Sequence, residues 1–92
     1  MFSFDLSDEL KKKLRILSKR DGVFCNSVNK KIKEIINNDA AAIDRYKNLR
    51  HDLSDHKRVH VHKSFVLTFK VVKDSHFIFF EKIEHHDDTY KK

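Results

Sequence analysis

The spacing of apolar residues changes near the middle of this 92-residue chain, and that change restricts the folds open to it. Between residues 7 and 36, apolar side chains recur every three or four positions, as they do on one face of a helix. From Lys57 onward, apolar and polar side chains alternate, as they do in a strand with one buried face. The sequence therefore predicts helices in its first half and a sheet in its second half.

Two helices are expected in the first half. Ser7 has the side chain of an N-cap residue, and the leucines that follow it at helical spacing extend a first helix from about Ser7 to Arg20. A second apolar stripe runs from Phe24 to Ile36. Gly22, the one glycine of the chain, follows the first helix where the chain must stop and turn. We expect the two helices to form an antiparallel hairpin with basic outer faces, followed by a short helical turn within Ala40–Tyr46.

Strands are expected at both ends of the chain. Phe2–Leu6 has a two-residue period, and so do three segments of the second half, at 57–62, 65–72 and 77–83. The short polar segments between the last three suit tight antiparallel connections. We therefore predict a single α+β domain over residues 1–92, with the order β-α-α-β-β-β. In this fold an N-terminal strand and the helical hairpin pack on a curved antiparallel sheet.

The net charge of +6 favours a polyanionic partner, because cationic side chains that neutralise phosphates release condensed counterions. An ordinary solvated basic surface would account for the same charge. The distribution is uneven, since residues 1–50 hold twelve basic and seven acidic side chains, whereas residues 51–92 hold eight and seven together with all seven histidines. The first half is thus suited to attract an anion, and the second to move protons near neutral pH.

Several compartments and chemistries are disfavoured. The single cysteine, Cys25, excludes an internal disulfide and a cysteine-based metal cage, and its place in an apolar helical stripe indicates packing. No apolar run approaches membrane-spanning length, and the N-terminus lacks the apolar core of a signal peptide. A chain with one glycine has neither a P-loop nor a dinucleotide fingerprint. We expect a cytoplasmic protein that works without a membrane and without a cofactor.

Three nitrogenous side chains alternate with valines in the segment that follows Lys57. Arg58, His60 and His62 share one face of this strand if the valines between them face the core. Two imidazoles and a guanidinium on one rigid surface can position a phosphate and transfer protons beside it, as cleavage of RNA by its own 2′-hydroxyl requires. The competing interpretation is a solvated polar face.

A second cluster, His85-His86-Asp87-Asp88, consists of side chains that can ligate transition metals. Its spacing matches no fixed metal motif, so a metal-dependent activity is kept only as an alternative. If the last strand continues through this segment, His85 and His86 point to opposite sides, and one alone can face Arg58.

Three segments of the second half share their order and spacing with a known family: YKNLRHDL at 46–53, RVHVHKSFVL at 58–67 and HHDDTYK at 85–91. Through them the chain resembles the RelE/ParE toxin superfamily, nearest its YafQ-like branch. The resemblance is close over residues 45–92 and rests on element order in residues 1–44. It implies a helical hairpin on a twisted antiparallel sheet. It also implies a toxin that cleaves mRNA in the ribosomal A site, by attack of the ribose 2′-hydroxyl on the adjacent phosphate.

The same resemblance gives catalytic roles to three histidines. His51, His60 and His86 match the histidines that the YafQ-like branch has in place of the lysines and arginines of RelE. We expect His60 and His86 to act as the general acid–base pair, with His51 as a third proton-transfer or orienting group, because imidazole can both donate and accept a proton near neutrality.

Substrate-binding residues are expected around this set. Arg58 should stabilise charge on the phosphate, with Lys57 and Lys63 as weaker candidates. Phe65 matches the tryptophan of the branch and Tyr90 its C-terminal aromatic, and both could stack on a substrate base. Ribosomal RNA should be held electrostatically by lysines of the two helices, namely Lys11, Lys12, Lys13, Lys30, Lys31 and Lys33.

One position departs from the branch, because Ser64 stands where an acidic residue is expected. Either Asp52 or Asp87 then orients a histidine, or the activity is weaker. The resemblance also implies two partners, the ribosome with its mRNA and an acidic cognate antitoxin. The alternatives are a non-catalytic binding toxin of the ParE type directed at gyrase and an inactive RNA-binding homologue.

Overall fold

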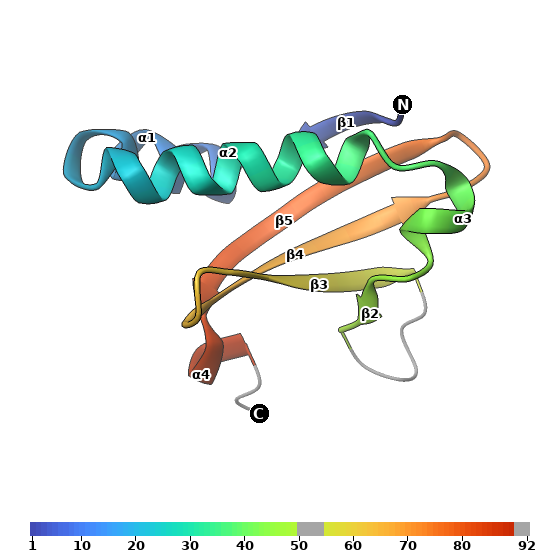
Figure 1. The fold of residues 1–92 in the computed structure, drawn as a ribbon. Helices are drawn as coiled ribbons and strands as arrows, with labels where there is room; N and C mark the ends of the chain where they lie inside the picture. Colours follow the sequence, from blue (N-terminus) through green and yellow to red (C-terminus); the bar gives the residue numbers. More distant parts are fainter. Residues whose placement is uncertain (50–54, 90–92) are drawn as a thin grey trace.

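The computed structural model describes residues 1–49 and 55–89. Within these ranges two helices lie side by side over one face of a five-stranded sheet, and a short C-terminal helix lies on the other side, beyond the end of the last strand (Figure 1). The elements in chain order are β1 (Ser3–Leu6), α1 (Asp8–Arg20), α2 (Gly22–Ile36), α3 (Ala40–Ile43), β2 (Lys47–Asn48), β3 (His56–Val61), β4 (Phe65–Val72), β5 (Phe77–His85) and α4 (His86–Thr89).

The helical hairpin forms where the sequence predicts it. The hydroxyl of Ser7 caps α1 by accepting a 3.0 Å hydrogen bond from the backbone N–H of Leu10. Asp21 serves both helices, because its backbone N–H bonds to the carbonyl of Leu17 while its side chain accepts from the N–H of Phe24. Gly22 is therefore the first residue of α2, and Asp21 alone separates the helices.

The sheet has the order β1-β5-β4-β3-β2. The three pairings among β2, β3, β4 and β5 are antiparallel, but β1 runs parallel to β5, with Ser3 beside Phe77 and Leu6 beside Phe80. The α+β class and the hairpin on a sheet are confirmed, whereas the sheet is mixed and not antiparallel throughout. Because no tight turn joins β1 to β5, local turn geometry does not set the direction of β1.

The core lies between the helices and one face of the sheet. Phe69 of β4 and Phe80 of β5 are fully buried, with ring centroids 5.6 Å apart. A register shift between Thr68 and Phe69 distorts the β4–β5 ladder beside them. Full burial of such a side chain contributes roughly 1.5–3 kcal/mol. The apolar side chains that alternate along the strands therefore form one face of the core. The helices pack against this face through Leu10, Val28, Ile32 and Ile35.

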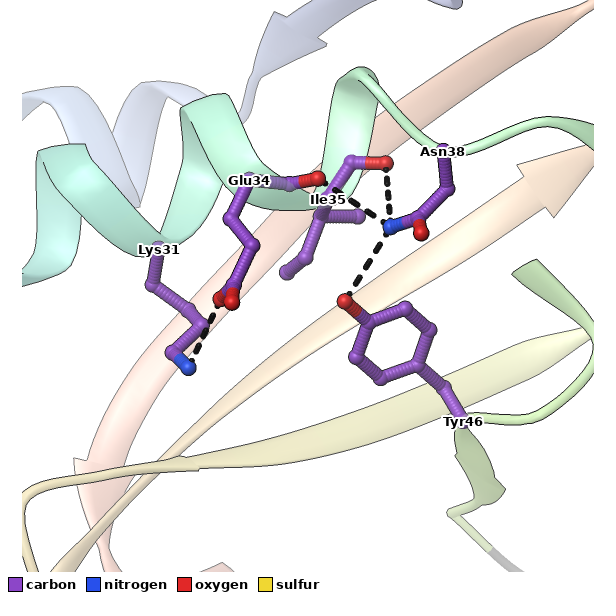
Figure 2. A network of polar contacts seen from close by, with 5 residues as sticks. All are labelled: Lys31, Glu34, Ile35, Asn38 and Tyr46. Atoms are coloured by element: carbon purple, nitrogen blue, oxygen red, sulfur yellow. Dashed lines mark hydrogen bonds and ion pairs between the residues drawn. The ribbon is translucent and has the colours of Figure 1, made fainter. Parts of the chain in front are cut away.

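The end of α2 is tied to the segment that enters the sheet. The Nδ2 atom of Asn38 donates to the backbone carbonyls of Glu34 and Ile35 and to the hydroxyl of Tyr46, each at 3.1 Å (Figure 2). Asp39 then caps α3, which is shorter than the expected helical turn, by accepting from the N–H of Ala42. These contacts set the position of β2, an element the sequence does not predict.

The last strand, expected to end near Ile83, extends two residues further and ends within the histidine pair. β5 ends at His85, and the chain turns at His86 into α4, where the N–H of His86 donates a 2.7 Å hydrogen bond to the carbonyl of Ser64. The contact is made across the β3–β4 turn, so α4 is held beside the end of β3. In the described part of the chain, no helix is both long and apolar enough to cross a membrane.

Candidate active site

His60 of β3 and His86 of α4 form the centre of the candidate site. Their imidazole rings are stacked, with centroids 5.5 Å apart and planes inclined by 23°. His60 is exposed and His86 half-exposed, so both rings are accessible to a ligand. The hydrogen bond between the His86 backbone and Ser64 anchors this contact. The two histidines predicted as an acid–base pair therefore lie together, while their roles stay a prediction.

Asp87 places a carboxylate beside this pair. Its carboxylate oxygens lie 3.7 Å from Nδ1 of His85 and 3.8 Å from Nδ1 of His86, and its backbone N–H donates to Nδ1 of His85 at 3.3 Å. The side chain is 85% exposed, so its attraction to a protonated imidazole is partly screened by solvent. Asp87 can thus take the orienting role left open by Ser64. Asp52, the other candidate, lies outside the described residues.

The row of charged side chains on β3 is shifted by two residues from the prediction. His56, Arg58 and His60 share the face that points away from the valines, whereas His62 has left the strand. His62 adopts a positive φ of 56° in the β3–β4 turn, and its Nε2 lies 3.0 Å from Oγ of Ser27 on α2. The expected Arg58/His60/His62 face was therefore wrong at His62, because β3 ends at Val61.

His56 is the site residue that the sequence prediction missed. Its Nδ1 lies 3.2 Å from Oδ1 of Asp55, and its Nε2 lies 3.7 Å from Oε1 of Glu81 on β5. The hydrogen bond from His56 lowers the pKa of the Asp55 carboxyl. The alternation that placed Arg58 and His60 on one face extends to residue 56, and this was the available signal.

Lys57 does not join the phosphate-binding face. It is only 5% exposed and lies on the same side of β3 as Val59 and Val61, where its Nζ donates to Oδ1 of Asn48 at 2.7 Å. Arg58 lies on the opposite side, half-buried, and its Nε donates to the Asn48 carbonyl at 3.0 Å. The prediction for Lys57 was wrong because neighbours in a strand point to opposite faces.

Phe65 and Lys63, also predicted to contact the substrate, differ in how far they are buried. Phe65 is half-buried, with its ring centroid 4.7 Å from that of Phe24 and 5.6 Å from that of His85. It therefore supports the site from within the core. Lys63 is exposed in the β3–β4 turn. His51 and Tyr90 lie outside the described residues.

The lysines predicted to hold ribosomal RNA fall into two groups. Three have partners within the protein: Lys13 donates to the carbonyl of Ile83 at 2.6 Å, Lys11 lies 3.4 Å from Asp5, and Lys31 lies 2.8 Å from Glu34. Lys12, Lys30 and Lys33 are exposed. Their surface positions agree with the predicted basic outer faces of the hairpin.

A groove runs between α2 and β3 at one side of the histidine pair. It has a volume of about 460 Å³, and its lining residues are Ser27, Lys30, Lys31, Glu34, His60, Val61 and His62. This groove was not predicted from the sequence, because helical and strand residues far apart in the chain form its walls. Over residues 1–49 and 55–89, no three His, Cys, Asp or Glu side chains are grouped to hold a metal ion.

Known proteins share both this sequence and this fold. No family model matches the chain. A protein of Methanocaldococcus jannaschii with the provisional name toxin RelE4 is 44% identical over 92 residues, which is all of this chain and 94% of that protein. A chain of the E. coli DinJ–YafQ complex matches with a TM-score of 0.73 and 18% identity, covering 99% of this chain and 100% of that one.

The isolated E. coli RelE toxin matches about equally well, with a TM-score of 0.72 and 16% identity over 92% of this chain and 84% of that one. The fold therefore does not separate the YafQ-like branch from RelE, and the placement in that branch still rests on residues. The whole-length relationship to RelE4 does establish the wider group. By that relationship, and with the fold in agreement, the chain belongs to the RelE/ParE toxin superfamily.

Proposed function

We propose that this protein is the toxin of a toxin–antitoxin system and that it cleaves mRNA in the ribosomal A site. The stacked contact of His60 and His86 is the observation that carries the proposal. Two accessible imidazoles at 5.5 Å can reach two different oxygens of one phosphodiester, as acid–base cleavage needs. This activity would take place in the cytoplasm, where mRNA is translated.

In the proposed reaction one imidazole removes the proton of the ribose 2′-hydroxyl. The 2′-oxygen bonds to the adjacent phosphorus, and the bond from phosphorus to the 5′-oxygen of the next nucleotide breaks. The second imidazole gives its proton to that 5′-oxygen, which leaves a 2′,3′-cyclic phosphate and a free 5′-hydroxyl. All atoms balance without a metal or a redox partner, and each histidine ends in the protonation state in which the other began.

Supporting groups surround the pair. Arg58, on the face of β3 that carries His60, would stabilise the charge that builds on the phosphate. Asp87, with a carboxylate oxygen 3.8 Å from Nδ1 of His86, would help to hold the ring in place. His51 is proposed as the third proton-transfer group on the basis of the resemblance alone. An acidic antitoxin is the proposed partner, since YafQ and RelE have been solved in complex with DinJ and RelB.

The test is induced expression of the wild type, His86→Gln and His60→Gln in a bacterial host, with growth recorded and mRNA 5′ ends mapped. Wild type should arrest growth and produce new cuts within translated codons, and both variants should lose the cuts while keeping the thermal unfolding of the wild type. His76→Gln makes the same chemical change at the β4–β5 turn, where His76 stacks on Phe2, and should still cut.

Other outcomes separate the alternatives. Undiminished cleavage by His86→Gln, or loss of its fold, contradicts the assignment of the acid–base pair. Growth arrest without mRNA cuts identifies a binding toxin such as a gyrase-directed relative. The absence of arrest in all chains indicates an inactive homologue.

A further inference from the structure

The groove between α2 and β3 begins at a residue of the proposed active site. His60 and Val61 form its β3 wall, and Ser27, Lys30, Lys31 and Glu34 form its α2 wall. Its volume of about 460 Å³ is in the range of pockets that bind small molecules, about 300–1,000 Å³. Because His60 belongs to both, the groove lies directly beside the histidine pair.

One contact joins the two walls. The Oγ of Ser27 donates to the carbonyl of Val23 at 3.1 Å, so its lone pairs are left to accept from Nε2–H of His62 at 3.0 Å. The His62 ring also meets Phe24 edge to face, with centroids 5.3 Å apart. These contacts hold His62 in its left-handed backbone conformation, which is uncommon for a residue other than glycine. The width of the groove is therefore fixed at the β3–β4 turn.

The polar lining favours an anion. Lys30 is exposed at the rim, and Lys31 extends from α2 toward β3 with its ammonium 2.8 Å from the Glu34 carboxylate (Figure 2). A ligand phosphate would compete with Glu34 for Lys31, whereas the exposed Lys30 could turn toward the phosphate from the rim. Val61 is the one apolar residue among those that line the groove, and the charged groups come from Lys30, Lys31 and Glu34.

We propose that this groove binds the phosphodiester next to the scissile one in the RNA substrate. The proposal rests on the proposed function, because the histidine pair defines which phosphate is scissile. Lys30 and Lys31 supply the charge, Glu34 limits the affinity, and the contact between His62 and Ser27 keeps the walls in place. Lys30 and Lys31 thereby belong to substrate binding, and not to the contacts with ribosomal RNA that the sequence suggested.

The test measures binding of RNA that cannot be cleaved. The probe is a dinucleotide with 2′-deoxyribose at the first position, used alone or with a second phosphate at its 5′ or its 3′ end. For the wild type, the second phosphate at one of these ends should tighten the Kd about ten-fold, because it gains charge-assisted hydrogen bonds from lysine. NMR titration of the full chain can follow this difference even where binding is weak.

Three variants on α2 make the test specific. Lys30→Gln should remove the gain from the second phosphate, whereas Glu34→Gln should enlarge it by freeing Lys31. Lys33→Gln is the matched control, because it removes the same charge from the same helix at an exposed residue outside the groove lining. Thermal unfolding of each variant should equal that of the wild type, since all three positions are on the exposed side of α2.

Equal losses in Lys30→Gln and Lys33→Gln would overturn the proposal, because they would indicate non-specific attraction to a basic helix. So would the lack of any gain from the second phosphate in the wild type. Tighter, Lys30-dependent binding of hexaglutamate than of the doubly phosphorylated probe would assign the groove to an acidic protein instead. None of these measurements requires cleavage, so a failure of the histidine mechanism in the expression test is seen separately.

Discussion

Lys57 and Arg58 are neighbours in β3 but bind the same residue from opposite faces of the strand. The Lys57 ammonium donates to the side-chain oxygen of Asn48, and the Arg58 guanidinium donates to its backbone carbonyl. Each bond thereby helps to attach β2 to β3. In this pair of strands, residue 47 lies beside residue 58 and residue 48 beside residue 57. Only Arg58 lies on the face that carries His60.

This difference predicts separate effects for two matched substitutions. Lys57→Met should lower the free energy of unfolding by about 1–3 kcal/mol, because the half-buried Asn48 side-chain oxygen loses its charged donor, yet leave mRNA cleavage per folded molecule unchanged. Arg58→Met should reduce cleavage. Urea denaturation and a cleavage assay on the same preparations measure both. A larger loss of cleavage in Lys57→Met than in Arg58→Met would show that Lys57 contacts the substrate.

Asp87→Asn should slow cleavage less than about ten-fold, because an exposed ion pair contributes at most about 1 kcal/mol and a ten-fold change in rate corresponds to 1.36 kcal/mol. The fold should be unaffected, because the Asp87 side chain is 85% exposed. Single-turnover cleavage rates, with thermal unfolding as the control for folding, are the measurement. A loss of rate well beyond ten-fold would mean that Asp87 has a larger part in the reaction than holding the ring of His86.

Ser7→Ala should destabilise the protein by about 1–2 kcal/mol, because the hydroxyl caps α1 and also donates to the Glu81 carbonyl at 2.6 Å. Ser18→Ala is the control, since its exposed hydroxyl bonds only within the helix, to the Arg15 carbonyl. The midpoint of urea unfolding should fall for Ser7→Ala and stay near the wild-type value for Ser18→Ala. Equal midpoints for the two variants would contradict the capping role.

The ion pair of Asp44 with Lys73 should make part of the free energy of unfolding depend on pH in the acidic range. A hydrogen bond from Lys73, at 2.9 Å, lowers the pKa of the Asp44 carboxyl. Because the pKa is lower in the folded than in the unfolded chain, the contribution is present above the unfolded pKa and is lost as pH falls through the folded one. Asp44→Asn should therefore lower Tm at pH 7 and have a smaller effect at pH 2. An equal change in Tm at both pH values would rule out this ion pair as the cause.

The parts of the fold that were predicted correctly depend on neighbouring residues. Ser7 caps a helix because of the residues that directly follow it, and the leucine spacing of α1 needs no knowledge of the sheet. The two-residue period of β4 likewise identifies Phe69 as a core residue. Residues close together in the chain determine the helix cap and the spacing of apolar side chains, so both can be predicted from a single sequence.

The parts that were not predicted depend on distant contacts. β3 ends at Val61 and His62 turns toward Ser27, 35 positions earlier in the chain. The chain turns out of β5 at His86, whose backbone N–H donates a hydrogen bond to the Ser64 carbonyl. The residue pattern of 85–89 does not predict that contact. The pairing of His60 with His86 was expected from a resemblance to known toxins, and their separation and ring angle come only from the three-dimensional structure.

The parallel pairing of β1 with β5 has a consequence for the order in which the molecule can fold. Helices α1 and α2 contact each other across a single residue, so they can pair as soon as both have been synthesised. β1, although it is made first, has β5 as its neighbour in the sheet and must wait for that strand. The contact of His60 with His86 is completed later still. While β5 remains inside the exit tunnel, the nascent chain can form its helical hairpin but neither the complete sheet nor the paired imidazoles.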